Sequence, residues 1–160
     1  MTKKNQLFLH LLEQIKFPNT FEDNSILQQG EVEDVDVFAT EKKWQIHVFL
    51  TTPLQFNTYH SFIEALKASF ADIVDVELDI RTQDGASTFL PEYWNYVVEN
   101  SKLLPMQKQV LSKETPTLKE NKWFISCTNK TTADLLSEEV LADLNEEFRK
   151  YGFFNIKFAT

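Results

Sequence analysis

Glycine is scarce in this sequence, and that scarcity excludes several kinds of functional site. The 160 residues include three glycines and one cysteine. Phosphate-binding loops need closely spaced glycines, and the sequence holds no P-loop, no other glycine-rich loop and no G-x-S-x-G motif. The single cysteine, Cys127, excludes an internal disulfide bond and any metal site built from several cysteines. One cysteine also suits a reducing compartment, so we predict a cytoplasmic protein.

Positive charge is also in short supply. Lys and Arg number 16 against 24 Asp and Glu, which gives a formal net charge of -8. The phosphates of a nucleic acid would meet a repelling field, so direct nucleic-acid contact is disfavoured and a protein partner is favoured. No window approaches the roughly 18 apolar residues of a membrane helix, and the amphipathic start is not a signal peptide. We therefore expect no membrane contact and no small-molecule ligand.

Apolar and aromatic residues are plentiful, and they predict one compact core. The hydrophobic fraction is 42%, and there are 14 Phe and three Trp. We expect a single domain over residues 1–160, and two sub-lobes, 1–85 and 86–160, remain an alternative. The sequence ends directly after an expected strand, so we also expect a fragment of a longer chain.

The first third of the sequence predicts a helix followed by a hairpin. Apolar residues recur at three- and four-residue spacing over residues 6–17, and Pro18 should end that helix. Two strands are expected at residues 31–38 and 43–50. The short polar link at residues 39–42 is typical of a hairpin turn.

A long helix and a strand follow the hairpin. Asn57 is a candidate cap for a helix with an apolar stripe, which consists of Tyr59, Phe62, Ile63, Leu66 and Phe70. Residues 73–81 then alternate apolar and acidic side chains, as a strand does when one face is buried and the other meets water.

The second half predicts three helices and two strands. Two short helices are expected, one beginning near Pro91 and one over residues 103–110. A strand at residues 122–127 precedes a helix that Gly152 is placed to end, and residues 154–158 complete the pattern as a strand. This order of elements predicts an α+β fold with a mixed or antiparallel sheet and helices mainly on one face.

Acidic residues on the expected strands suggest two readings. Asp75, Glu77 and Asp79 share one strand face, and Glu33, Asp34 and Asp36 can lie on a neighbouring strand, as carboxylates do in two-metal sites. A solvated sheet face explains the same alternation. We expect no histidine among these carboxylates, so we predict a solvated face, with no metal and no cofactor.

Candidate catalytic groups are few. His10, His47 and His60 form no metal-binding or catalytic spacing. A small hydrolase using Cys127 or the acidic face remains a third hypothesis, and cysteine in an apolar strand is ordinarily a small buried residue. We predict no catalytic residue and therefore no enzyme in these residues.

Aromatic residues in the second half are the candidate partner-binding residues. Tyr and Trp are enriched at the centres of protein interfaces. Tyr93 falls on the apolar face of its helix, whereas Trp94 turns away from that face, so Trp94 is a candidate for partner contact. Tyr151 and Phe153 are further candidates, and packing in the core is the alternative explanation for all four.

Four segments in the first half carry a family resemblance. They are GEVEDVDV at residues 30–37, WQIHVFL at 44–50, YHSFIEAL at 59–66 and FADIVDV at 70–76. This sequence resembles the start of PolC, the replicative DNA polymerase III alpha subunit of low-GC Gram-positive bacteria. The best match covers residues 27–80, and the order of later elements agrees more loosely.

The resemblance implies a function and a fold. It implies a DNA-replication fragment that lacks the DNA-directed polymerase and 3′-5′ exonuclease activities of its parent, and that tethers the polymerase to the clamp-loader tau subunit. The implied fold is a degenerate KH-like arrangement, although the G-x-x-G loop of an active KH domain is absent. A KH-like or OB-like domain that binds single-stranded nucleic acid is the alternative function. The family offers no catalytic residue to carry over.

Overall fold

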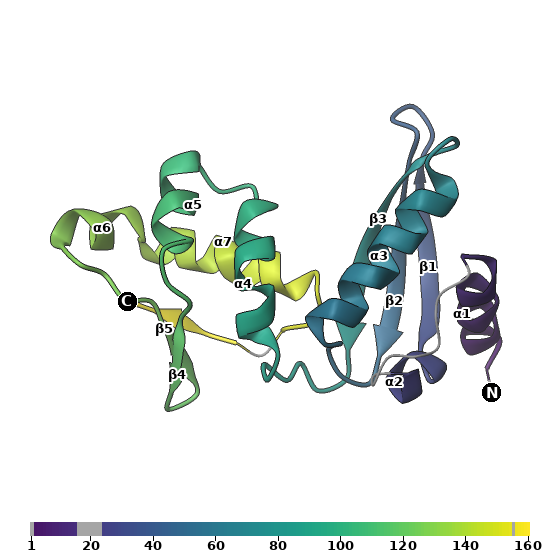
Figure 1. Ribbon diagram of the computed structural model, residues 1–160, viewed down its shortest axis with the longest axis horizontal. Helices are drawn as coiled ribbons and strands as arrows, with labels where there is room; N and C mark the ends of the chain where they lie inside the picture. The colour runs from purple at the N-terminus through teal and green to yellow at the C-terminus, as the bar shows by residue number, and fades with distance from the viewer. Residues whose placement is uncertain (1, 16–23, 155) are drawn as a thin grey trace.

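The fold consists of two small three-stranded sheets with helices packed around and between them. The computed structural model describes residues 2–15, 24–154 and 156–160. Figure 1 shows an elongated molecule in which the first sheet and the second lie toward opposite ends of the long axis. The α+β class predicted from the order of elements is confirmed, and the strands form two sheets rather than one.

In the first half of the chain, described residues 2–15 and 24–85 form three helices and a sheet of strand order β1-β2-β3. Its elements are α1 (Lys3–Gln14), α2 (Asn24–Gln28), β1 (Glu31–Phe38), β2 (Lys43–Leu50), α3 (Phe56–Phe70) and β3 (Asp75–Thr82). Strand β1 pairs antiparallel with β2, and β2 pairs parallel with β3.

In the second half, the described part of the chain (86–154 and 156–160) forms four helices and a sheet of strand order β4-β5-β6. Its elements are α4 (Leu90–Glu99), α5 (Pro105–Leu111), β4 (Thr117–Lys119), β5 (Lys122–Phe124), α6 (Lys130–Leu135), α7 (Glu138–Arg149) and β6 (Phe158–Ala159). Among the residues described, no helix is long and apolar enough to cross a membrane.

The apolar stripe of α3 buries one face of the first sheet. Tyr59, Phe62, Ile63 and Leu66 are at most 4% exposed, and they cover the alternate apolar residues of β2 and β3, which include Ile46, Val48, Leu50, Val76 and Ile80. Helix α1 packs on the same face, where the rings of Phe8 and Phe62 meet edge to face with centroids 5.8 Å apart. The opposite face of the sheet carries the acidic residues that alternate with these apolar ones.

The two halves repeat one connection. In each half, two strands form an antiparallel hairpin. One or two helices then connect the hairpin to a third strand, which lies parallel to the second strand of the hairpin. A pair of helices precedes each hairpin. The strands of the second sheet are two or three residues long, and such short strands show no period of their own, so the sequence gives no sign of the repeat.

A short parallel bridge joins the two halves. The N–H of Ile80 on β3 donates to the carbonyl oxygen of Lys150 at 2.8 Å, and Ile80 pairs with Tyr151. Two residues further along, the hydroxyl of Thr82 donates to the carbonyl oxygen of Gly152 at 2.6 Å. The end of α7 therefore lies against the outer edge of β3, and one apolar core runs through both halves.

Several expected boundaries are corrected. Asn57, the expected cap of the long helix, is not its N-cap: α3 begins at Phe56 with Gln55 as its N-cap, so Asn57 lies inside the helix. The strand expected at residues 122–127 ends at Phe124, and the strand expected at 154–158 is formed at Phe158–Ala159. The hairpin turn at 39–42 is confirmed. Phe17 and Pro18, where the first helix was expected to end, lie outside the described residues.

Candidate functional site

The face of the first sheet that points away from α3 is lined with carboxylates. The strand register places Asp34 of β1 beside His47 of β2, and His47 beside Asp79 of β3. Asp36, Gln45 and Glu77 form the next row. Side chains in one row point to the same face, so alternation along three strands gathers the acidic residues around one histidine.

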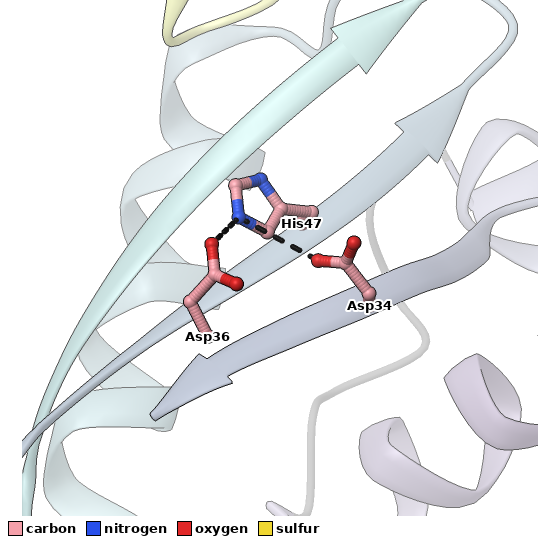
Figure 2. Close-up of side chains that lie close together, drawn as sticks. All are labelled: Asp34, Asp36 and His47. Atoms are coloured by element: carbon pink, nitrogen blue, oxygen red, sulfur yellow. Dashed lines mark hydrogen bonds and ion pairs between the residues drawn. The ribbon is translucent and has the colours of Figure 1, made fainter. Parts of the chain in front are cut away.

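His47 bridges all three strands. Its Nδ1 lies 2.7 Å from a carboxylate oxygen of Asp79, and its Nε2 lies 2.7 Å from Asp36. Figure 2 shows Asp36 and Asp34 converging on the same ring nitrogen, with Asp34 more distant at 3.6 Å. An ionised carboxylate can only accept hydrogen bonds, so this arrangement favours the charged imidazolium, in which both ring nitrogens donate.

Two opposing effects set the pKa of His47. Partial burial lowers it, because burial disfavours the charged ring. The hydrogen bonds to Asp36 and Asp79, with the charges of Asp79 and Asp34, outweigh burial and leave the pKa raised above its ordinary value. The geometry and the direction of the pKa shift agree, because both favour the charged form of His47 among the carboxylates around it.

The expectation that no histidine lies among these carboxylates is wrong. One ligand atom each from Asp34, Asp36 and His47 lies within 4.8 Å of the others, a spacing that could hold a metal ion. Both nitrogens of His47 are already bonded to carboxylates, however, and hard cations such as Ca²⁺ take six or more oxygen ligands. The arrangement is best described as a cross-strand charge cluster.

The four aromatic residues predicted to bind a partner lie mostly in the core. Tyr93, Trp94 and Phe153 are 0% exposed, and Tyr151 is half-buried. The indole N–H of Trp94 donates to the carbonyl oxygen of Leu111 at 2.8 Å. The prediction that Trp94 points away from the packed face is therefore wrong, because α4 has neighbours on both sides.

Tyr93 and Tyr151 connect the second half of the chain to the first. The hydroxyl of Tyr93 donates to the carbonyl oxygen of Leu54 at 2.7 Å, and its ring meets that of Phe153 with centroids 5.0 Å apart. Tyr151 meets Tyr59 at 5.2 Å. Burial is the main cause that raises the pKa of Tyr59 and Tyr151. Their phenols stay protonated and neutral, which suits a structural joint.

Two features escaped prediction from the sequence. His47 alternates with Trp44, Ile46 and Val48, so its polar orientation could have been inferred, but the identity of its partners depends on register. The second feature is β1 itself, which exposes Val35 and Val37 as well as its carboxylates. Apolar residues exposed on an edge strand cannot be recognised before the sheet order is known.

Two protein-family models match the chain. Residues 7–80 match the family model "DNA polymerase III polC-type N-terminus I", and residues 92–160 match "DNA polymerase III polC-type N-terminus II". The chain belongs to the PolC-type DNA polymerase III family. Both models describe N-terminal regions of PolC rather than its catalytic region.

Individual PolC proteins are similar to nearly the whole chain. The PolC-type DNA polymerase III of Pediococcus pentosaceus is 28% identical over 157 residues, which cover 96% of this chain and 11% of that protein. That of Latilactobacillus sakei is 30% identical over 93% of this chain and 10% of its own length. That of Bacillus subtilis is 27% identical over 91% and 10%. The chain thus spans about a tenth of these relatives, and no solved structure matches it significantly.

Each of the two PolC family regions corresponds to one half of the structure. The charge cluster around His47 lies inside N-terminus I, and the buried Trp94 lies inside N-terminus II. The contacts of Tyr59 with Tyr151 and of Ile80 with Lys150 join the two regions.

Proposed function

We propose that this chain is a non-catalytic protein-interaction module of a PolC-type replicative polymerase and docks that polymerase to the tau subunit of the clamp loader during chromosomal replication. The observation that carries the proposal is the match of both halves to the two N-terminal regions of PolC. Protein docking needs a rigid surface and no reactive group, and a standard interface covers about 800 Å² on each partner.

The charge distribution supports a polypeptide partner over a nucleic acid. The net charge is -8, and the open face of the first sheet carries a row of carboxylates around one histidine. A single strand of DNA would meet repulsion there. The second half has no glycine between α6 and α7, and a KH domain needs a G-x-x-G loop to clamp a nucleic-acid backbone.

A titration with purified tau tests the proposal. The 160-residue chain and the tau subunit of the same organism are mixed in a calorimeter, and we expect saturable binding with one chain per tau subunit. The same chain is titrated with labelled single-stranded DNA at low salt as a control, and we expect no change in anisotropy. Absence of heat with tau, together with salt-dependent binding of DNA, would replace this proposal with the nucleic-acid alternative.

A further inference from the structure

The outer edge of β1 is open along its second half. Strand β1 is at the edge of the first sheet, and every side chain at residues 33–38 is exposed. No strand among the described residues pairs with it on the side away from β2. The opposite edge of the sheet is partly covered, because Ile80 of β3 pairs with Tyr151 there. An open edge is a template for another strand.

Helix α1 reaches the beginning of β1. The amide of Asn5 donates to the carbonyl oxygen of Gly30 at 2.6 Å, and Lys4 forms an ion pair with Glu33 at 2.8 Å. The register then shifts between Val32 and Asp34. A bulge of this kind bends and twists the strand. It separates the beginning of β1, which α1 contacts, from the exposed remainder of the strand.

The exposed part of β1 presents different chemistry on its two faces. Val35 and Val37 stand beside Ile46 and Trp44 of β2, on the face that α3 covers elsewhere, and they are 42% and 61% exposed. Asp34 and Asp36 stand on the His47 face, with side chains 70% and 54% exposed. An added strand would therefore meet valine on one side and carboxylate on the other.

The charges decide which strand could be added. A second copy of β1 would bring its own carboxylates onto this acidic edge, and like charges in cross-strand positions destabilise a pair. A polypeptide segment that alternates Lys or Arg with apolar residues would satisfy both faces at once. We propose that the open edge of β1 binds such an extended basic and apolar segment of a protein partner, by strand addition.

A synthetic peptide tests the edge without any assumption about tau. A ten-residue peptide alternating Lys and Val is titrated into the 160-residue chain, and backbone amide exchange is followed by NMR. We expect slower exchange at residues 34–38 and no such change with a matched peptide alternating Glu and Val. If the Lys and Val peptide protects no amide in β1, the proposal is wrong.

Two variants assign the binding to the two faces. Val37→Lys removes an apolar contact and Asp34→Asn removes a charge, and each should weaken peptide binding roughly fivefold, as expected for losing one cross-strand pair. Met106→Lys on α5, at a residue as exposed as Val37, and Asp134→Asn, at an exposed residue of α6, are matched controls that should bind as the unaltered chain does. Equal affinity in all four variants would overturn the assignment.

The inference deepens the proposed function, and the two can fail separately. When the unaltered chain binds tau, the same variants are titrated with tau, and Val37→Lys and Asp34→Asn should again weaken binding roughly fivefold. Tau binding that neither variant weakens would place the tau surface elsewhere and overturn the inference for this partner. Peptide binding without tau binding would support strand addition at the open edge of β1 and exclude tau as the partner.

Discussion

The Nδ1 atom of His47 on β2 lies 2.7 Å from a carboxylate oxygen of Asp79 on β3. The second ring nitrogen of His47 makes an equally short contact with Asp36 on β1, so one side chain connects three strands of the first sheet. Because an ionised carboxylate only accepts hydrogen bonds, this connection is strongest when the imidazole carries a proton on both nitrogens. Stability of the sheet should therefore depend on pH.

We predict that the free energy of unfolding falls as pH rises through the folded-state pKa of His47. That pKa is raised above the ordinary 6.5. A raised folded-state pKa gives stabilisation that is fully present below the unfolded pKa and is lost once the folded protein releases its proton. Urea unfolding at about pH 6 and about pH 8.5 should show the decrease, and NMR titration of the ring should place the transition.

Variants separate this effect from other titrations. His47→Gln should remove the pH-dependent component, so that its unfolding free energy differs less between the two pH values. His10→Gln removes an exposed histidine and serves as the matched control. Unchanged pH dependence in His47→Gln would show that the carboxylate contacts of His47 do not stabilise the fold.

Trp94→Ala should destabilise the chain strongly. The side chain is fully buried, stacks on Phe148 with centroids 5.7 Å apart and donates to the carbonyl of Leu111. Its removal leaves a cavity and an unpaired carbonyl, at a cost of about 3–5 kcal/mol. Thermal unfolding measures the loss. A small loss, combined with weaker tau binding, would instead place Trp94 at the interface.

Long amphipathic elements could be predicted from the sequence because they contain several periods. The stripe of α3 and the alternation of β2 and β3 fixed both their type and their buried face. Strand β4 and helix α6 are three and six residues long, too short to show a period. The environment of Trp94 could not be predicted either, since a helical stripe identifies one packed face and α4 is packed on two.

The partners of His47 lay beyond prediction for a different reason. Its position on the polar face of β2 follows from alternation alone. Which carboxylates face it depends on the register of β1 and β3, and the shift between Val32 and Asp34 changes that register on β1. Register is set by long-range pairing, so a single sequence could predict an acidic face and still miss the histidine at its centre.

Gly152→Ala should weaken the joint between the two halves. Gly152 has a φ of +100°, where side chains are rarely tolerated, and a Cβ there would lie 2.7 Å from Cγ2 of Thr82. Backbone strain of this kind costs on the order of 1–3 kcal/mol. Urea unfolding of the variant should show a loss in that range or above it.

A double-mutant cycle divides that loss into two causes. Thr82→Ser removes the Cγ2 methyl and keeps the hydroxyl, which donates to Gly152 and accepts from the N–H of Gly85. In the Thr82→Ser background, Gly152→Ala should cost less, because the steric contact is gone and backbone strain remains. The same cost in both backgrounds would assign the whole effect to the backbone.

Thr58→Val should stabilise the chain. Thr58 lies in the first turn of α3 and is 1% exposed, and its hydroxyl has no hydrogen-bond partner among the described residues. Valine keeps the branched shape and removes the unpaired hydroxyl, which should increase the free energy of unfolding by about 1 kcal/mol.

The change should raise the melting temperature by roughly 2–4 °C for a chain of this size. Thr58→Ser is the matched control, because it keeps the hydroxyl and loses the methyl, and it should lower the melting temperature. A lower melting temperature in Thr58→Val would mean that the hydroxyl is hydrogen-bonded in solution, to an ordered water molecule or to a backbone carbonyl. Thr58 would then be a polar anchor of α3, and the packing of that helix against the first sheet would depend on more than its apolar stripe.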